Sequence, residues 1–440
     1  MREDWIECNL DEVCEIQTGK YDANHAKIDG NYRFYTCAFD YLKCNTNRFG
    51  GKSIILPGNG ANVGEVFYYD GEFDAYQRTY VINDIKIDAK YIYYNLKGFW
   101  KIRNIDKQFG SATNYVRIGN FTSFILNIAP LPIQRAIVSK IEALFSDLDN
   151  GIANFKKAQE QLKIYRQAVL KKAFEGKFTN GNIKDDELPK GWKWVNSGEF
   201  FSFVTSGSRG WAKYYSESGS IFIRITNLNF DTLNLDLRTN KIQYVNPPKN
   251  SEGLRTKVEE GDFLFSITGY LGMFAIAPKL ESAFVNQHVC LCRPKDTFNK
   301  KYLAYWITAK SGGHYYLNKN QKGAVKAGLN LDDLKTFPVP LPPTIEEQNQ
   351  IVAEIESRLS VCDKVEQSIN ESIEKAEALR QSILKKAFEG KLLSQAEIEL
   401  CKKEADYEPA SELLKKIQAE KAERITNGKL RITKSKKAKE

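Results

Sequence analysis

Leu170–Lys177 reads Leu-Lys-Lys-Ala-Phe-Glu-Gly-Lys, and Leu384–Lys391 repeats it letter for letter. The shift from residue 170 to residue 384 is 214 positions, and the same shift brings Gln134 onto Gln348 without a gap. It also superposes the Ile-Val-x-x-Ile-Glu patterns that begin at Ile137 and at Ile351. A chance identity of eight residues within such a register is negligible, so the chain contains an internal duplication.

Both copies carry the apolar spacing of one long helix. In the second copy, apolar residues recur in steps of three and four, close to the 3.5-residue repeat of a coiled-coil seam: Ile351, Ile355, Leu359, Cys362, Val365, Ile369, Ile373, Ala376, Leu379, Ile383 and Ala387. The first copy has the matching stripe, weakened by Gly151 and Gln159: Ile137, Ile141, Phe145, Leu148, Phe155, Leu162, Tyr165, Val169 and Ala173. Proline-rich sequence precedes each copy, and Gly176 or Gly390 follows where helices commonly stop. About forty residues at ~1.5 Å each predict helices of roughly 60 Å.

Helices of this length need a partner for the apolar stripe, and each copy offers the other one. Because the first helix delivers the chain to the second intervening region, the second helix has to run back antiparallel to bury its stripe on the first. The expected arrangement is an antiparallel coiled coil with a globular domain at each end and a pseudo-two-fold relation between the halves. The simpler alternative is a pair of unconnected surface helices.

Composition limits the class of protein. A chain of 440 residues with 42% hydrophobic content is long enough for two to four domains with real cores. The net charge of +9 and the pI of about 8.9 are compatible with a polyanionic partner but do not establish one. Eight cysteines without a Cys-x-x-Cys pair, and only three histidines, favour reduced thiols over a zinc site. With no signal-peptide pattern and no apolar run of about 18 residues, we expect a soluble, cytoplasmic protein.

Short β-like runs separated by glycine turns fill the regions outside the helices. In residues 1–130 these runs are Tyr32–Cys37, Ser53–Leu56, Glu65–Tyr69, Thr79–Asn83 and Phe124–Ile128, with a helix-like piece at Ala89–Ile102. In residues 178–340 they are Phe200–Thr205, Ile221–Ile225, Phe263–Ile267, Phe274–Ala277 and Val289–Arg293, with a helix-like piece at Lys300–Ala309. The predicted fold class is therefore α+β, with two domains of small twisted β-sheets separated by an antiparallel coiled coil. The predicted boundaries are 1–130 and 178–340 for the domains, 131–177 and 341–393 for the spacer helices, and 394–440 for a charged, basic C-terminal tail.

The two globular regions share a faint framework. Ile16-Gln-Thr-Gly19 resembles Phe203-Val-Thr-Ser-Gly207, and Gln77-Arg78 before one strand resembles Gln287-His288 before another. The loops between such points differ completely. This contrast fits two domains that bind one general type of ligand with different local specificities, and ordinary divergence after duplication is the alternative.

A catalytic motif is not recognisable. Asn246-Pro247-Pro248 resembles the start of the amino-methyltransferase motif, but Lys249 stands where an aromatic residue would stack on the flipped base. A Walker A motif and a Pro-Asp dipeptide are missing, which argues against ATP hydrolysis and the common nuclease signature. None of the three histidines has a recognisable triad setting. The sequence predicts a protein without a reaction of its own and with no metal or cofactor in this chain.

Without a catalytic motif, ligand recognition is the function left to consider. The candidate loops for it combine basic, amide and aromatic residues. Arginine and lysine can pair with guanine O6 and N7, and asparagine and glutamine with adenine N6 and N7, whereas small hydroxyls suit phosphates. The candidate DNA contacts are Lys20, Tyr21, Arg33, Arg78, Ser111, Thr113, Arg117, Ser208, Arg209, Lys213, Arg224, Asn227, Gln287, His288, Lys322 and Lys326. The basic run at the end of the chain is most simply a solvated tail, with non-specific phosphate contact as its functional alternative.

Duplicated helices around two unlike α+β regions resemble the specificity subunit of type I restriction–modification enzymes. The best-matching stretches are Leu341–Glu356 and the two Leu-Lys-Lys-Ala-Phe-Glu-Gly-Lys segments, and the resemblance covers residues 1 to about 393. It implies two target-recognition domains that each bind one half of a split site in double-stranded DNA. It also implies a helical spacer that fixes the gap and docks two methyltransferase subunits, with partner contacts at Gln134, Phe174, Glu347, Gln348 and Phe388. S-adenosylmethionine, ATP and Mg²⁺ would then be used by the methyltransferase and by a restriction motor–nuclease subunit, not by this chain.

The first copy departs from this pattern at one point. Pro130–Gln134 is four residues shorter than Pro340–Gln348 and lacks the acidic residue before the glutamine. We expect the docking of a methyltransferase at that end to differ. Two other classes stay open from sequence alone: a coiled-coil adaptor whose end domains bind proteins, and an enzyme with an unrecognised site in residues 178–340.

Overall fold

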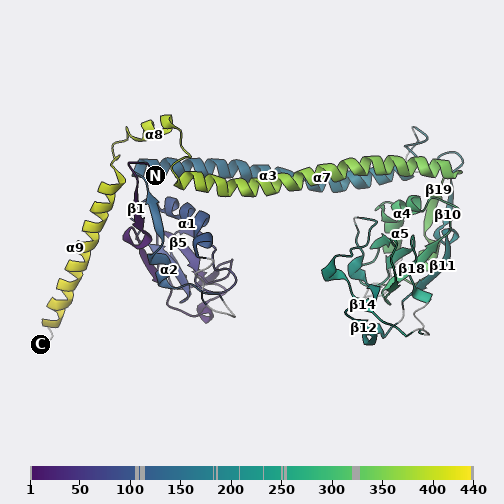
Figure 1. Ribbon diagram of the computed structural model, residues 1–440, viewed down its shortest axis with the longest axis horizontal. Coiled ribbons are helices and arrows are strands. Elements are labelled where there is room, and N and C mark those ends of the chain that lie inside the picture. Colours follow the sequence, from purple (N-terminus) through teal and green to yellow (C-terminus); the bar gives the residue numbers. More distant parts are fainter. Residues whose placement is uncertain are drawn as a thin grey trace. The chain divides into compact units, whose positions relative to one another are not determined.

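The computed structural model describes residues 2–437 except 105–108, 110–113, 182, 185–186, 208, 231, 249–250, 252–254 and 320–327, and the side chains of 425 and 427–437 also lie outside the description. The chain divides into two compact units. Unit 1 combines Met1–Asn154 with Glu371–Glu440, and unit 2 is Phe155–Asn370. Both units mix helices with small β-sheets, which confirms the predicted α+β class (Figure 1).

The globular part of unit 1 is built from nine short strands and two helices among the described residues. They are β1 (Ile6–Asn9), β2 (Glu15–Thr18), β3 (Tyr32–Tyr35), β4 (Leu42–Cys44), β5 (Lys52–Pro57), β6 (Phe67–Asp70), β7 (Phe73–Ala75), β8 (Thr79–Asn83), α1 (Ala89–Asn104), α2 (Ile118–Thr122) and β9 (Ile125–Ile128). Three sheets result, with the strand orders β2-β8-β5-β6, β4-β3-β7 and β1-β9. All five strands predicted in this region are present, with ends shifted by a few residues.

Unit 2 has the same kinds of elements in the same order. They are β10 (Lys193–Asn196), β11 (Phe201–Ser206), β12 (Tyr215–Ser216), β13 (Ser220–Ile223), β14 (Tyr244–Val245), β15 (Phe263–Ser266), β16 (Phe274–Ile276), β17 (Ala283–Val285), β18 (Val289–Pro294), α4 (Lys300–Thr308), α5 (Gly313–Lys319), α6 (Asp333–Thr336) and β19 (Pro338–Leu341). Its sheets are ordered β11-β18-β15-β16, β12-β14-β13-β17 and β10-β19.

The strand pairings show that the duplication includes the globular regions. In unit 1, β2 and β5 both pair antiparallel with β8, and β3 pairs parallel with β7. In unit 2, β11 and β15 both pair antiparallel with β18, and β13 pairs parallel with β17. The first strand of each region closes on the last, β1 on β9 and β10 on β19. The faint sequence framework therefore reflects one topology used twice.

Each copy of the duplicated segment forms one continuous helix, as predicted. These helices are α3 (Leu131–Phe174) and α7 (Ile345–Phe388). Both end in a Schellman motif: Gly176 and Gly390 have φ of +71° and +72°, a conformation that glycine adopts without strain. The amides of Lys177 and Lys391 then donate to the carbonyls five residues back, at 3.0 and 2.8 Å. The shared Glu-Gly-Lys sequence thus fixes where both helices stop.

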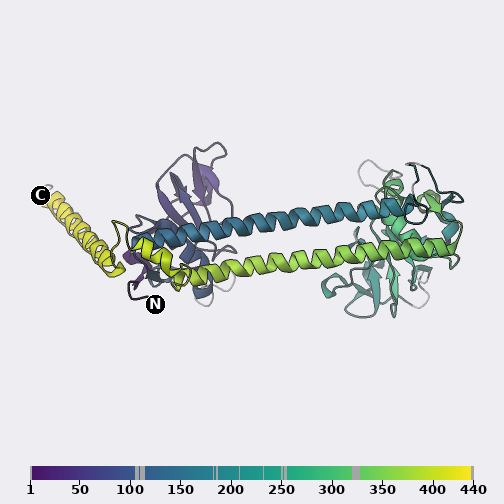
Figure 2. The ribbon, with the colours of Figure 1, turned by 90° about the horizontal axis from the view of Figure 1, so that it is seen from above.

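In each unit, its segment of α3 lies antiparallel beside its segment of α7 (Figures 1 and 2). In unit 1, Arg380 on α7 reaches Asp149 on α3 at 2.5 Å. In unit 2, Gln159 donates to Asn370 at 2.7 Å, and Arg166 forms ion pairs with Asp363 and Glu366. The partner residue number falls as the α3 number rises, which is the register of an antiparallel pair.

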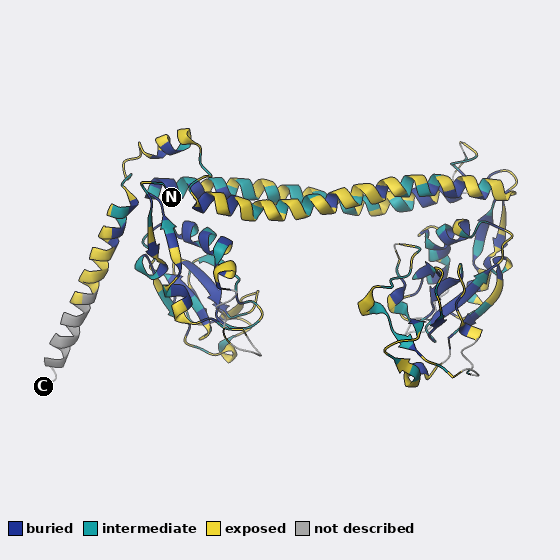
Figure 3. Ribbon diagram, viewed as in Figure 1, coloured by how far each residue is buried: buried dark blue, intermediate teal, exposed yellow. Residues whose placement is uncertain are grey.

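The apolar stripe has two kinds of partner rather than one. Near the helix ends it is buried in the cores of the globular regions, where Ile137, Ile141, Ile351 and Ile355 have almost no exposed surface (Figure 3). In the middle of α7 the cover is uneven, since Cys362 and Ile369 are buried whereas Val365 is 42% exposed. The sequence prediction named only the facing helix as partner of the stripe, and at the helix ends the globular cores cover it as well.

In the C-terminal segment, predicted as charged and basic, the part before the final basic run packs on unit 1. Helix α8 (Gln395–Cys401) and the beginning of α9 (Ala410–Lys437) pack on unit 1 (Figure 1). Ile398, Ala410, Leu414 and Ile417 are buried in its core. The positions 410, 414 and 417 have helical spacing, but the surrounding charges hid this stripe in the sequence. In the described part of the chain, no helix is long and apolar enough to cross a membrane.

The ion pair of Lys140 with Glu397 fastens α8 to α3 and predicts an acid-sensitive contact. Lys140 lies 2.8 Å from Glu397 and, with hydrogen bonds from Ser394, lowers the pKa of that carboxyl to about 2. A carboxyl with a lowered pKa contributes stability that is complete above its unfolded pKa and is lost as the pH falls through the folded value. We expect hydrogen exchange in α8 to accelerate between about pH 4.5 and pH 2. The Glu397→Gln variant should lack this pH-dependent component, and equal acceleration in both proteins would contradict the assignment.

Candidate nucleic-acid interface

Two glycines bring the candidate loops of each unit together. A side chain at Gly19, just after β2, would overlap the carbonyl of Ala75 at the end of β7. A side chain at Gly207, just after β11, would overlap the carbonyl of Val285 at the end of β17 in the same way. The loop after β2 or β11 therefore crosses the loop that precedes β8 or β18 at van der Waals distance. This crossing explains the shared glycines and places basic and amide residues side by side.

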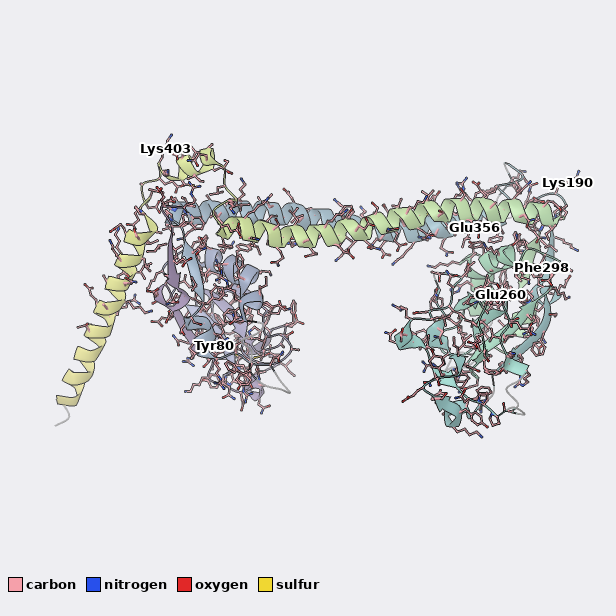
Figure 4. All side chains as sticks on the ribbon, viewed as in Figure 1. Tyr80, Lys190, Glu260, Phe298, Glu356 and Lys403 are labelled. Atoms are coloured by element: carbon pink, nitrogen blue, oxygen red, sulfur yellow. The ribbon has the colours of Figure 1, made fainter. Side chains whose placement is uncertain are left out.

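In unit 1, Arg78 lies beside a cavity of about 340 Å³ at this crossing. Exposed Arg78 and Gln77 share its lining with Asn59 and Tyr115. Tyr80, labelled in Figure 4, forms part of the floor and packs on Phe121 with ring centroids 4.2 Å apart.

Arg117 joins the same surface through Tyr115. It donates to the Tyr115 hydroxyl at 3.1 Å, and its guanidinium lies over the Phe109 ring at 4.2 Å. The arginine is exposed, so its charge is available to a ligand.

Arg33 lies in a second cavity of unit 1, of about 420 Å³. Its guanidinium lies over the rings of Tyr41 and Tyr69, 4.4 and 4.2 Å from their centroids. It also donates to the Tyr35 hydroxyl at 3.1 Å, a hydrogen bond that raises the pKa of the guanidinium. Alternation along β3 puts residues 33 and 35 on one face of the strand, which is why they meet.

Lys20 and Tyr21 follow β2 near the same loops. Lys20 is exposed, whereas Tyr21 stacks on His25 with centroids 3.8 Å apart. The Tyr21 carbonyl accepts from the Gln77 amide at 2.8 Å, which fixes the loop. Of Lys20 and Tyr21, Lys20 therefore has the side chain that is exposed to a ligand.

Unit 2 carries a different set of side chains on the same frame. His288 contacts Thr268 through Nδ1 at 2.6 Å and Gln287 through Nε2 at 3.0 Å, so both ring nitrogens are engaged. Arg209 and Lys213 are exposed on the loop after β11, beside Trp211, which stacks on Phe222. The surface of unit 2 is thus basic at the Arg209 loop, whereas Gln287 supplies a side-chain amide just before β18.

Two candidates of unit 2 have internal roles. Asn227 is fully buried, accepts from the Arg224 amide at 2.9 Å and donates to the Asp236 carbonyl at 2.9 Å. Arg224 is half-buried and donates to the Lys241 carbonyl at 3.2 Å. Asn227 therefore closes a turn instead of facing a ligand. Ser111, Thr113, Ser208, Lys322 and Lys326 lie outside the described residues.

The residues predicted to contact a partner protein sit at the junctions of the long helices. Phe388 is buried in unit 1 against Tyr91, with centroids 5.0 Å apart. Phe174 is buried in unit 2 against Tyr302, with centroids 5.2 Å apart. Both phenylalanines therefore anchor a helix end to a globular core and offer almost no surface to a second protein.

The duplicated glutamines also have internal partners. Gln134 accepts from the Asp88 amide at 3.0 Å and donates to the Ala129 carbonyl at 2.7 Å. Gln348 accepts from the Asn299 amide at 2.9 Å. Asp88 and Asn299 precede α1 and α4 directly, so each glutamine ties the start of a long helix to the start of a domain helix.

This role predicts a stability loss for Gln134→Ala. The substitution leaves a buried donor and a buried acceptor unsatisfied, and each such group costs about 1–3 kcal/mol. The expected result is a lower free energy of unfolding in chemical denaturation of the full chain. Gln381→Ala, at an exposed position of unit 1, is the matched control and should change stability by less than about 0.5 kcal/mol. Equal stability of the two variants would contradict the role of Gln134.

Glu347 has no counterpart in unit 1, and the structure shows what it does in unit 2. Its Oε1 accepts from Thr179 at 2.8 Å and from the Trp192 indole at 3.0 Å, which ties the chain after α3 to the start of α7. The 214-residue shift puts buried Ile133 in its place. The corresponding indole of Trp5 is buried and, among the described residues, has no hydrogen-bond partner. The shortened sequence thus removes an internal contact, and its effect on docking remains a prediction.

The chain contains two α+β units with one topology. Each unit has its own set of basic, amide and aromatic loop residues, as expected of a protein with two ligand-recognition domains. No cluster of three or more metal-ligating side chains occurs among the residues that the structure describes. Residues 2–157 and 189–375 match the family model described as the type I restriction modification DNA specificity domain. This match covers more than half of the chain, so the protein belongs to that family.

Individual relatives agree with the family. The chain is 29% identical over 442 residues to the type I restriction enzyme EcoDI specificity subunit of Escherichia coli, covering 95% of this chain and 96% of that protein. Among solved structures, it resembles the HsdS subunit of Thermoanaerobacter tengcongensis, with a TM-score of 0.53, 19% identity, and coverage of 89% of this chain and 98% of that one. A chain in a structure of a type I R-M system matches with a TM-score of 0.67 and 19% identity, covering 89% and 99%. These matches confirm the resemblance and do not favour a protein-binding adaptor.

Sequence reasoning missed the surroundings of Arg33 and of Arg78. Tyr41, Tyr69 and Glu72 reach the Arg33 cavity from other parts of the chain, and no local pattern marks them. Asn59 reaches the Arg78 cavity from the glycine loop after β5, where Gly60 and Gly64 were the available signal.

Proposed function

We propose that unit 1 and unit 2 each bind one half of a split DNA target, as the two recognition domains of a DNA specificity subunit. The observation that carries the proposal is the combination of one topology with two unrelated sets of loop residues, within a family described by DNA specificity. A shared frame suits a common ligand, duplex DNA, and different loops suit different base sequences. The functional candidates in unit 1 are Lys20, Arg33, Arg78 and Arg117, and in unit 2 they are Arg209, Lys213, Gln287 and His288.

The long helices are proposed to set the gap between the half-sites. Each has 44 residues, or about 66 Å at ~1.5 Å per residue, while one turn of B-DNA is about 34–36 Å. A helix pair of that length is sufficient to hold two domains on successive major-groove faces. A packed pair resists changes in length, whereas a flexible linker would accept variable gaps.

The chemistry is proposed to reside in partner subunits. Two methyltransferase subunits would dock on the helices and transfer a methyl group from S-adenosylmethionine to adenine, and a motor–nuclease subunit would use ATP and Mg²⁺. The role of this chain is then to position those subunits on one sequence. Because Phe174, Phe388 and Gln134 are buried, we place the docking surfaces on exposed residues of α3 and α7 within each unit.

Co-expression of the full chain with its methyltransferase subunit, followed by mapping of methylated adenines in the host DNA, tests this function. A split motif with a fixed gap is the expected result. Methylation without sequence preference would favour the adaptor alternative. Methylation of DNA by this chain alone with S-adenosylmethionine would support the enzyme alternative.

A further inference from the structure

Two cations, Arg33 and Lys43, line the Arg33 cavity together with the carboxylate of Glu72. In the pairing of β3 with β4 (Leu42–Cys44), Arg33 stands directly opposite Lys43. Directly opposite residues of an antiparallel pair lie on one face of the sheet, and like charges there are unfavourable. Among the described residues, neither cation forms an ion pair, although Glu72 lines the same cavity. Two cations on one face that form no ion pair among the described residues favour a ligand with acceptor atoms.

The two tyrosines restrict how Arg33 can bind that ligand. The guanidinium carbon lies over both rings, 4.4 and 4.2 Å from their centroids, and one Nη donates to the Tyr35 hydroxyl. Cation–π contacts of this kind also keep the guanidinium plane fixed. The guanidinium N–H groups that Tyr35 does not engage remain to donate hydrogen bonds, and they point along the guanidinium plane. A planar ligand with two adjacent acceptors fits these N–H groups.

We propose that the Arg33 cavity binds the O6 and N7 edge of a guanine and so specifies one base of the unit 1 half-site. This inference rests on the proposed function and assigns one element of its specificity. Guanine is the base whose major-groove edge presents two adjacent acceptors, and arginine pairs with it in bidentate fashion. The carboxylate of Glu72 in the cavity wall disfavours a phosphate, which is anionic on every side, and suits a base pair that also offers an amino donor.

The complex of the full chain with its methyltransferase tests the assignment on oligonucleotides that carry the mapped motif. Each guanine of the unit 1 half-site is replaced in turn by 7-deazaguanine, which lacks the N7 acceptor. The wild-type complex should lose affinity at the guanine that Arg33 contacts, whatever other guanines also contribute. Arg33→Ala should weaken binding to the unmodified site by about 5- to 150-fold, the equivalent of one bidentate pair. The variant should then be insensitive to the analogue at that guanine, as expected for coupled partners.

Arg48→Ala is the matched control. Arg48 also lies over an aromatic ring, Phe49 at 5.3 Å, in the same unit, but it does not line the cavity. It should retain wild-type affinity and sensitivity. Retention of the unit 2 half of the motif by Arg33→Ala in the methylation map shows that the variant folds and assembles.

Several results would overturn the assignment. Equal weakening at every base, with a salt slope reduced by about one charge, would make Arg33 a phosphate contact. An unchanged motif in Arg33→Ala would remove the residue from recognition. A split motif without guanine in the unit 1 half would refute the pocket alone, whereas a wild-type complex without any split motif would refute the proposed function together with it.

Discussion

Replacing Phe388 by alanine should lower the free energy of unfolding of unit 1 by about 3–5 kcal/mol, the usual cost of truncating a buried phenylalanine. Its ring is 3% exposed and meets the rings of Tyr91 and Phe99, with centroids 5.0 and 6.0 Å away. Neighbouring Leu384 packs close to Gly98 on α1, so little space is available for the site to collapse. Hydrogen exchange of the full chain, measured separately over α1 and α4, should show faster exchange in α1.

Phe174→Ala is the matched experiment, because the eight residues around the two phenylalanines are identical. Its ring meets Tyr302 and Trp306 in unit 2, so faster exchange should appear in α4 instead. Lys385→Ala removes an exposed side chain one turn away and should change exchange little. If each phenylalanine variant accelerated hydrogen exchange equally in both units, the conclusion that each ring stabilises only one core would be wrong.

These anchors show how far sequence reasoning reaches. The repeat, the two helices and their glycine stops could all be predicted, because each depends on local chemistry and on a period. The spacing of apolar residues predicts an apolar helix face but does not identify which part of the protein covers that face. Ile351 in the core of unit 2 and half-exposed Val365 belong to the same stripe, and only the tertiary structure separates them.

The missed strands have a similar explanation. Pro338 and Pro340 belong to β19, although proline usually argues against a strand. They are two residues apart, so both missing amides point to the same side of a two-stranded ribbon in which β10 is the only paired neighbour among the described strands. Their carbonyls accept hydrogen bonds from Trp306 at 2.9 Å and from Tyr302 at 2.6 Å. Long-range partners of this kind are not encoded in a local pattern.

The candidate DNA contacts also include residues that the sequence could select and residues whose role only the tertiary structure shows. Residue types alone selected Arg33, Arg78 and Arg117, which the structure places beside cavities or on exposed loops. The same criterion selected Asn227, which closes a buried turn. A polar residue in a loop satisfies either the backbone or a ligand, and its sequence neighbours do not distinguish the two.

Insertion of seven residues into both long helices should change the DNA target more than any substitution. Insertion after Asn154 in α3 and after Glu374 in α7 preserves the antiparallel register, in which Asp149 meets Arg380 and Gln159 meets Asn370. One heptad adds about 10 Å of helix and rotates the far end by only about 20°. The methylation map of the co-expressed complex should show both half-sites unchanged and a longer gap between them.

The size of that change follows from the helical twist of DNA. At about 3.4 Å per base pair, length alone allows about three more base pairs. Three base pairs also rotate the second half-site by about 100°, since a turn has about 10–10.5 base pairs, and seven helical residues do not supply that rotation. We therefore expect about one or two extra base pairs, with the rest of the added length absorbed by displacement along the groove. The same heptad in α3 alone puts the cross-helix pairs out of register and should abolish specific methylation. A constant gap in the doubly extended protein, or altered half-sites, would show that the helices do not measure the distance.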